Sequence, residues 1–268
     1  MTDRMTDRVT GPGSGRFTAA RPPATARFTI PKTAGLEFGR RLRAWYRRNA
    51  RDLPWRRTRD PYEVLVSELM LQQTQVIRVV PRYGEFLRRF PTLASVAASE
   101  PAQVMEAWEG LGYYARARSL HQLARLTAPA LPDDPAALRT LPGIGAYTAG
   151  AVASFAYERR AALVDTNVAR VLTRVFAPGL DPRTPRGRRT AWAIAEATLP
   201  RSGTVVFVQN QALIELGALI CTARVAHCSA CPVKVVCKSA TAANVRRPRA
   251  GISDRTARYR PAGPVSVR

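Results

Sequence analysis

Hydrophobic residues recur every three or four positions along most of the chain, the period of an α-helix with one buried face. Leu36–Asn49 shows this pattern, and Pro61 can open a second helix because proline fits the first helical turn. Pro81 is predicted to begin another, with Tyr83 and Phe86 on one face. Further helices are predicted at residues 93–98, 101–108, 114–128, 135–140, 146–157, 167–176, 185–197 and 205–219.

Strand signals are poor. The one β-branched run, at residues 204–208, is interpreted as the start of a helix. No repeat with a period of 20–50 residues is visible. The predicted fold class is therefore all-α.

The stretch Leu141–Asp165 combines a glycine turn, a helix of small residues and an acid. Gly143 and Gly145 flank Ile144, so the backbone can bend there with its N–H groups turned outward. The next helix directs its positive end the same way, which predicts an anion site that suits a phosphate. An ordinary helix–turn–helix corner with a C-terminal glycine is the alternative.

The formal charge of +23 predicts a polyanionic partner. Residues 1–35 contribute +4 and residues 238–268 contribute +7, which leaves +12 for the segment between them. The helical part is thus strongly basic by itself, and nucleic acid is the expected partner.

Both ends of the chain are rich in Pro, Gly and Arg and lack apolar periodicity. Residues 1–35 and 239–268 are therefore predicted to be disordered basic tails. No apolar run of 18 residues and no signal-peptide pattern is present, so no membrane association is predicted and a cytoplasmic, nucleoid-associated location is expected.

The four cysteines, Cys221, Cys228, Cys231 and Cys237, all lie in one segment with the spacing C-x6-C-x2-C-x5-C. Nothing supports export, so a metal centre is favoured over disulfides. Zinc sites usually contain two close cysteine pairs, and only Cys228 and Cys231 qualify. The uneven spacing favours a [4Fe–4S] cluster, with structural zinc as the alternative.

Four longer stretches match one family in the right order. They are LPWRRTRDPYEVLVSELMLQQTQV (53–76), GLGYYARAR (110–118), VDTNVARVL (164–172) and NQALIELGALICT (210–222). Together with LPGIG and the cysteine spacing, they resemble the MutY-type adenine DNA glycosylases of the helix-hairpin-helix (HhH-GPD, endonuclease III) superfamily. The resemblance covers roughly residues 36–238.

This resemblance implies a two-lobed helix-hairpin-helix glycosylase fold with a C-terminal iron–sulfur cluster loop. A six-helix lobe would span residues 53–161, and residues 36–52 would join 162–238, including the loop 221–237, in a second lobe. The implied partner is double-stranded DNA that contains a mismatch or an oxidised base pair, bound by a monomer.

The resemblance also assigns catalytic roles. Cleavage of an N-glycosidic bond needs a protonated acid at the leaving base and a carboxylate facing the sugar cation. Glu68 matches the general acid, and its apolar neighbours are expected to raise its pKa. Asp165 matches the second carboxylate, assisted by Asn167. An exposed helical glutamate and a helix N-cap aspartate are the alternative interpretations.

Tyr147 bears on the reaction class. Endonuclease III-like enzymes carry a lysine at this position, whose amine attacks the sugar and enables strand cleavage. A phenol cannot form that Schiff base, so a monofunctional glycosylase without lyase activity is predicted. The alternative role for Tyr147 is helix packing.

A base must leave the duplex to reach such a pocket. The resemblance implies that Gln72, Gln73 and Gln75 fill the vacated space and that Tyr113 intercalates at the mismatch. Residues implied to line the base pocket are Trp55, Arg56 and Gln211. A polar helix surface for the glutamines and core packing for Trp55 are the alternatives.

The sequence departs from the family in two places. MutY-type enzymes usually carry a Nudix-like C-terminal domain, whereas only about 30 residues follow Cys237, so this domain is expected to be missing. The second acid lies in Asp-Thr-Asn where Asp-Gly-Asn is commoner. A mismatch thymine or uracil glycosylase, or one acting on another lesion, is the alternative function. A catalytically silent DNA-binding iron–sulfur protein is a more distant one.

Overall fold

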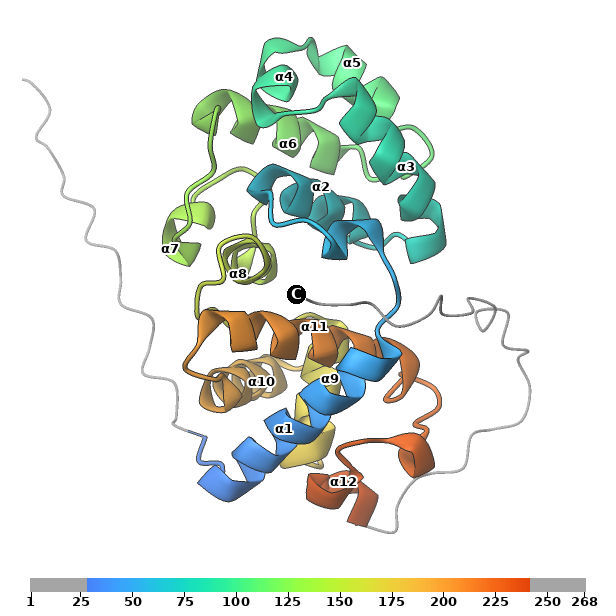
Figure 1. Ribbon diagram of the computed structural model, residues 1–268, viewed down its shortest axis with the longest axis vertical. Coiled ribbons are helices and arrows are strands. Elements are labelled where there is room, and N and C mark those ends of the chain that lie inside the picture. Colours follow the sequence, from blue (N-terminus) through green and yellow to red (C-terminus); the bar gives the residue numbers. More distant parts are fainter. Residues whose placement is uncertain (1–27, 242–268) are drawn as a thin grey trace, which may run out of the picture.

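The computed structural model describes residues 28–241, which form helices and no strand. Figure 1 shows two halves, with α2 to α7 above and α1 and α9 to α12 below, and α8 near their junction. The all-α, two-lobed prediction is confirmed. No helix among the described residues is both long and apolar enough for a membrane span.

The upper half is built from short helices that follow one another closely. Their bounds are α2 (Pro61–Leu71), α3 (Val76–Arg89), α4 (Leu93–Ala98), α5 (Pro101–Ala107), α6 (Ala115–Thr127) and α7 (Pro135–Leu138), preceded by the 3-10 turn η1 (Pro54–Arg56). With α8 (Ala146–Phe155), the range 53–161 holds seven α-helices. The periodicity predicts all seven, including α7, whereas the resemblance implied six.

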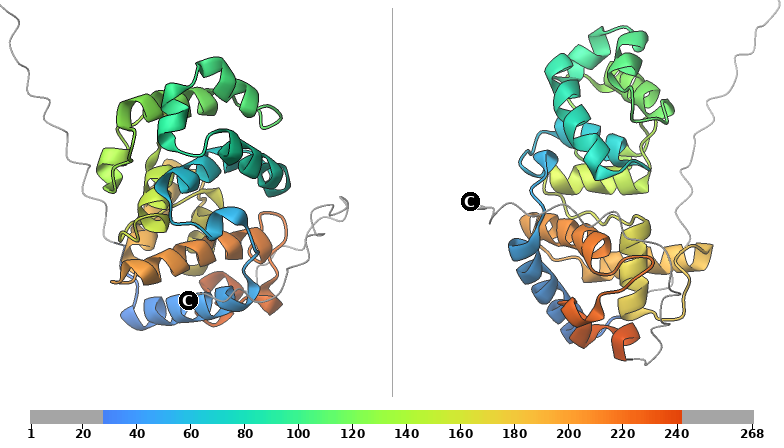
Figure 2. Two further views of the ribbon diagram at one scale, coloured as in Figure 1. Left: turned by 45° about the horizontal axis from the view of Figure 1, so that its top comes forward. Right: turned by 90° about the vertical axis from the view of Figure 1, so that its right-hand side faces the viewer.

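The lower half joins the start of the described chain to its end. It contains α1 (Lys32–Asn49), α9 (Thr166–Phe176), α10 (Pro185–Thr198), α11 (Gly203–Leu219), the turns η2 (Cys228–Ala230) and η3 (Lys234–Val236), and α12 (Lys238–Thr241). Helix α1 packs against α11, and α9 packs against both α10 and α11 (Figures 1 and 2).

Helix starts follow local chemistry that can be read in the sequence. Asp60 accepts hydrogen bonds from the N–H groups of Tyr62 and Glu63, and Pro61 occupies the first turn of α2. Aspartate or threonine before proline also starts α7 and α10. These side chains satisfy N–H groups that a helix start otherwise leaves unpaired.

Three predicted boundaries are wrong. Helix α3 begins at Val76, so Pro81 lies inside it; its missing hydrogen bond would have gone to Ile77, which is exposed to water. The predicted N-terminal tail contains ordered residues, because Phe28 and Ile30 pack against the core and α1 begins at Lys32. Residues 239–241 are helical. The rest of both predicted tails lies outside the described residues.

Helices α8 and α11 lie where the two halves meet, and both are buried on nearly all sides. Phe155 of α8 and Phe207 of α11 meet edge to face with ring centroids 5.7 Å apart. Gly150 lets α8 approach the following segment closely, since a Cβ atom there would lie 2.1 Å from the carbonyl oxygen of Ala162. This approach brings the start of α9 next to α8.

We expect Gly150→Ala to lower the free energy of unfolding by about 1–3 kcal/mol, because the added methyl group collides with backbone. Gly84→Ala, in the exposed part of α3 with nothing within 4 Å, should instead raise it by about 0.5–1 kcal/mol. Urea unfolding of the two variants measures both effects. Equal stability of the two variants would contradict the packing role of Gly150.

Candidate active site and cysteine-lined cavity

Glu68 is a carboxylic acid buried in the middle of α2, with 5% of its surface exposed. Burial raises its pKa to about 7; a hydrogen bond from Tyr147 opposes this shift and the nearby carboxylate of Asp165 adds to it. At neutral pH the group is thus divided between its acid and its base form. Such a group can donate a proton to a bound molecule.

Tyr147 lies in the first turn of α8 and its hydroxyl donates a hydrogen bond to Glu68. Burial and the carboxylates of Glu68 and Asp165 raise the pKa of Tyr147 well above its ordinary value. The side chain therefore remains a neutral phenol. It links the acid on α2 to the helix that follows the glycine turn.

Asp165 is the N-cap of α9, so the alternative interpretation of this residue is correct as a description of its structure. Its Oδ1 accepts a hydrogen bond from the N–H of Val168 (2.6 Å) and its Oδ2 accepts one from Nδ2 of Asn167 (3.1 Å). These bonds fix the carboxylate. Its negative charge raises the pKa of Glu68, so the two carboxyl groups interact electrostatically.

The side chain of Asn167 is held in position by Arg170 and Gly217, which the sequence analysis did not select. Its Oδ1 accepts a hydrogen bond from Arg170, which also donates to the carbonyl groups of Gly217 (2.9 Å) and Cys221 (2.9 Å). A Cβ atom on Gly217 would lie 2.9 Å from the Cβ of Asn167. Arg170 thus connects Asp165 and Asn167 to the first residue of the cysteine segment.

A buried carboxylate, Glu215, organises the predicted base pocket. It is fully buried and accepts hydrogen bonds from Arg51 (2.9 Å) and Arg56 (2.6 Å). Burial would raise its pKa, but the two guanidinium groups outweigh this effect and lower the pKa to about 2. Arg56 also donates to Oε1 of Gln211 (3.1 Å), so two of the three predicted pocket residues touch.

The predicted set did not include Glu215 or Arg51. A single acid inside the apolar run ALIELGAL was the signal available for Glu215. The third predicted pocket residue, Trp55, is buried and meets Tyr83 edge to face at 5.5 Å. Core packing therefore describes its contacts in this structure.

The predicted wedge residues lie on two neighbouring loops. Gln73 and Gln75 are exposed on the loop after α2, and Tyr113, which is 60% exposed, lies on the loop before α6. A cavity of about 540 Å³ is lined by both loops and by Arg78. Gln72 differs from the other two glutamines, because its amide donates to the hydroxyl of Thr148 in α8 (3.3 Å).

The glycine turn before α8 has the predicted outward-facing backbone. Gly143 and Gly145 are exposed, and Gly143 adopts φ +74°, a conformation that favours glycine. The side chain of Ile144 is buried, and its N–H donates to the carbonyl of Leu141 (3.2 Å). That N–H is engaged in the turn in this structure, and a contribution of Ile144 to anion binding stays a prediction.

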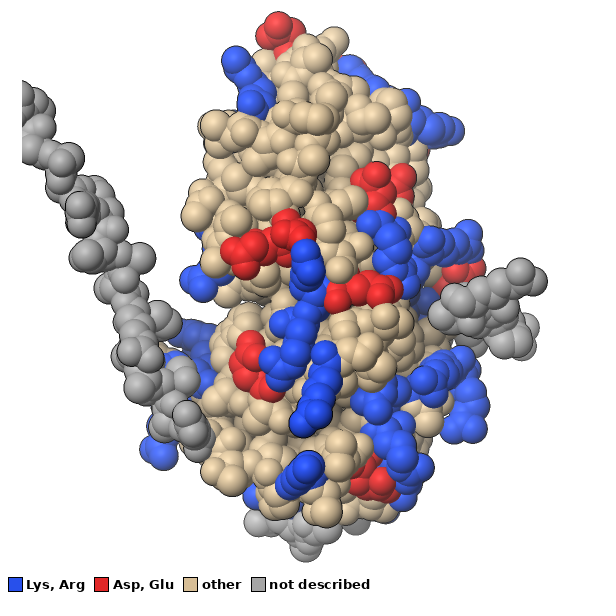
Figure 3. Space-filling model, turned by 60° about the vertical axis from the view of Figure 1, so that its left-hand side comes forward, with Lys and Arg blue, Asp and Glu red and all other residues tan. Residues whose placement is uncertain are grey.

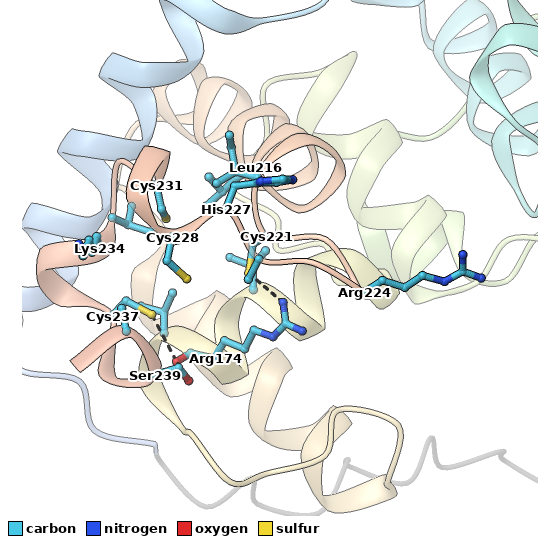
Figure 4. A pocket seen from close by; sticks show the side chains of 16 residues that line it. Arg174, Leu216, Cys221, Arg224, His227, Cys228, Cys231, Lys234, Cys237 and Ser239 are labelled. Carbon is cyan, nitrogen blue, oxygen red and sulfur yellow. Dashed lines mark hydrogen bonds between the residues drawn. The ribbon is translucent and has the colours of Figure 1, made fainter. Parts of the chain in front are cut away.

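The four cysteines gather around one cavity of about 270 Å³ below α11 and beside α9. All four are free thiols, and their sulfur atoms point toward a common space (Figure 4). Arg174 of α9 lies against this space and donates to Sγ of Cys221 (3.4 Å). Burial raises the pKa of Cys231 to about 11.

The donor set at this cavity consists of four thiols. Among residues 28–241, no three His, Cys, Asp or Glu side chains converge as ligands of a single metal ion. Four thiols spaced around a cavity are the ligands that a four-iron cluster requires.

The comparison with known families decides the identity of the chain. Residues 66–196 match the model of the HhH-GPD superfamily base excision DNA repair proteins. The chain belongs to this superfamily. The matched segment runs from α2, which carries Glu68, into α10, and so includes Tyr147 and Asp165.

Curated relatives are adenine DNA glycosylases. The protein of Mycobacterium tuberculosis is 44% identical over 200 residues, which cover 72% of this chain and 64% of that protein. The human protein is 42% identical over 211 residues, which cover 74% of this chain and 38% of that protein. The chain thus spans less than two thirds of the length of both.

Solved structures share the fold. A thermostable thymine-DNA glycosylase has a TM-score of 0.70 at 28% identity, covering 78% of this chain and 97% of that one. A trapped complex of endonuclease III with DNA has a TM-score of 0.66 at 20% identity, covering 79% and 97%. The second likeness shows the fold alone.

Glu68→Gln should stabilise the protein at alkaline pH. The pKa of Glu68 in the folded protein, about 7, lies above its ordinary value of 4.5, so its favourable contribution is complete below pH 4.5 and is lost as the pH rises through 7. Glutamine does not ionise. The free energy of unfolding of the variant should therefore exceed that of the parent by ~3 kcal/mol at pH 8, and by far less at pH 5. Urea unfolding at both pH values measures the difference.

The same substitution at the exposed Glu109 is the matched control. If the stability difference between Glu68→Gln and the parent were the same at pH 5 and pH 8, Glu68 would not carry a raised pKa.

Proposed function

We propose that this chain is a monofunctional DNA glycosylase that removes adenine mispaired with guanine or 8-oxoguanine. The observation that carries the proposal is the buried acid Glu68, with a pKa of about 7 that the charge of Asp165 helps to raise, hydrogen-bonded to Tyr147. It occurs in the HhH-GPD fold, in a chain whose curated relatives are adenine DNA glycosylases.

The two carboxyl groups have complementary tasks. Glu68 in its protonated form donates a proton to the departing base, which makes the base a better leaving group. Asp165, fixed by Val168 and Asn167, presents a negative charge to the sugar cation that develops. Tyr147 orients Glu68 and has no amine to form a Schiff base, so no strand cleavage accompanies base release.

The polar groups that the resemblance assigns to the base pocket are donors and acceptors that match adenine. Adenine presents an exocyclic amino group as a donor and ring nitrogens as acceptors. The ionised Glu215 can accept from the amino group, while Arg56 and Gln211 carry N–H groups for the ring nitrogens. Adenine would form hydrogen bonds with these groups in place of some that they now make to one another. The groups are already shielded from water and held in position.

The partner we propose is double-stranded DNA, bound by a monomer in the nucleoid. The segment 36–237 carries a charge of +12. On the face that Figure 3 shows, basic side chains exceed acidic ones over the junction and the lower half. The N–H groups of Gly143 and Gly145 suit a phosphate. The exposed loops with Gln73, Gln75 and Tyr113 suit the space that an extruded adenine leaves.

We also propose that Cys221, Cys228, Cys231 and Cys237 hold a [4Fe–4S] cluster. When bound, the cluster supplies a rigid cross-link for the segment and a redox-active group. The chain's own Arg174 and Arg170 join this segment to α9 and so to Asp165. Structural zinc is the competing assignment.

A thymine or uracil glycosylase acting on mismatches with guanine is the second candidate. The observation in its favour is the similarity of the whole fold to a thermostable thymine-DNA glycosylase. The contacts of Glu215 with Arg51 and Arg56 support the first candidate, because an ionised carboxylate would face a carbonyl oxygen of thymine instead of an amino group.

We expect the parent protein to release adenine from duplexes with A opposite G or 8-oxoguanine, and strands to break only after alkali. Asp165→Asn should slow release by about 10²–10³-fold while DNA binding persists, since asparagine is also a good N-cap and preserves α9. Single-turnover kinetics measure the rate. Asp134→Asn, the same change at the N-cap of α7, is the matched control.

Release of thymine or uracil opposite guanine in place of adenine would assign the second candidate function. An Asp165→Asn variant with the parent rate would remove Asp165 from the reaction.

Purified protein should contain iron and acid-labile sulfide in equal amounts, with a broad visible absorption. Cys231→Ser should lose iron and lower the thermal stability of the lower half, because the segment loses its cross-link. Metal analysis and absorption spectra of both proteins test this. One zinc per chain and no sulfide would establish the structural-zinc alternative.

A further inference from the structure

Arg116 is a buried arginine that contacts backbone instead of an acid. It is 8% exposed, and no carboxylate among the described residues pairs with it. Its guanidinium group donates hydrogen bonds to six carbonyl groups and one hydroxyl. The acceptors are the carbonyls of Leu69 (2.7 Å), Met70 (2.9 Å), Gln72 (2.6 Å), Leu111 (3.1 Å), Gly112 (2.8 Å) and Tyr113 (3.3 Å), and the hydroxyl of Thr74 (3.2 Å).

These acceptors belong to two segments that are far apart in the sequence. The carbonyls of Leu69, Met70 and Gln72 end α2, where a helix leaves acceptors without partners. The hydroxyl of Thr74 lies on the loop after α2, and the carbonyls of Leu111, Gly112 and Tyr113 lie on the loop before α6. One guanidinium group therefore fixes the loop 72–75 relative to the loop 110–114. These are the two loops that line the cavity of about 540 Å³.

Both loops contain residues in strained conformations. Gln73 has φ +56° and Tyr113 has φ +48°, in the left-handed region that side chains other than glycine rarely adopt. Such conformations persist only when surrounding contacts hold them. The bonds from Arg116 to the carbonyls of Gln72, Gly112 and Tyr113 immediately flank or include both residues.

Arg116 also touches the exposed aromatic ring itself. Its guanidinium carbon lies 5.4 Å from the ring centroid of Tyr113 and 5.7 Å from that of Trp108. Tyr113 is 60% exposed, so most of its ring is available to another molecule. The cation beneath it limits the directions in which that ring can project.

We propose that Arg116 is a positioning residue that holds the Gln73 and Tyr113 loops at a fixed separation and so determines which base pair the enzyme accepts. The inference rests on the proposed function, since it assigns those loops to DNA. When the loops are already in their binding arrangement, they contact an easily opened mismatch without a further cost of ordering. When the loops are not held, the affinities for matched and mismatched base pairs become more similar.

Arg116→Lys tests the proposal, because lysine keeps the charge but has only three donors on a flexible stem. Discrimination is measured as the ratio of kcat/KM for adenine opposite 8-oxoguanine to that for adenine opposite thymine. We expect this ratio to fall at least tenfold in the variant, through KM for the mismatch, with kcat changed much less. Arg118→Lys, an exposed arginine on the same helix, should leave the ratio unchanged.

A double-mutant cycle separates positioning from a general loss of structure. If Arg116 acts through Tyr113, the loss of discrimination in Tyr113→Ala and in Arg116→Lys should not add in the double variant. Additive losses, or an unchanged ratio with only a lower melting temperature, would overturn the proposal.

The proposed function can fail separately. If the parent released no adenine, the same variants would be compared by fluorescence anisotropy with mismatched and matched duplexes. Loss of the binding preference in Arg116→Lys would still support the positioning role, and its retention would overturn it.

Discussion

The ion pair of Glu215 with Arg51 and Arg56 is the interaction on which much of the arrangement depends. A fully buried carboxylate is costly unless several hydrogen bonds satisfy it, and here two guanidinium groups and a backbone N–H do so. The arginines belong to the segment that leaves α1 and enters the upper half, whereas Glu215 lies on α11. The contact therefore fixes where the chain crosses between the halves, beside Glu68.

Close approach of backbone is the second requirement of the site. Helix α8 packs tightly on the segment before α9, which ends at Asp165, and Gly150 leaves the space for this approach. Gly217 does the same for Asn167. The absence of a side chain at Gly150 and Gly217 thus permits the close packing of the site, and Arg170 and Tyr147 supply polar contacts around it.

The sequence predicted most of the fold because helices with one buried face leave a clear period, and because Asp60, Asp134 and Thr184 stand before prolines at helix starts. It failed at Pro81, where a solvent-facing carbonyl tolerates proline inside α3. Motif resemblance singled out Glu68, Tyr147, Asp165 and Asn167 as site residues, but the contact of Glu68 with Tyr147 is tertiary and could not be predicted from the sequence. Arg116 and Arg170 went unnoticed because composition alone does not separate a buried arginine from the exposed ones in a chain with 42 Lys and Arg residues. Arg116 did share a helical face with Leu120 and Leu123, which was a usable signal.

Helices α8 and α11 have almost no exposed face, unlike α1, α3 and α10. A larger side chain on an exposed helix face can extend into water. On α8 or α11 it must displace closely packed side chains of both halves. We therefore expect substitutions to accumulate in the exposed helices over evolutionary time and to be rarer in α8 and α11. The alignment of the two halves would then be the slowest-changing property of the molecule.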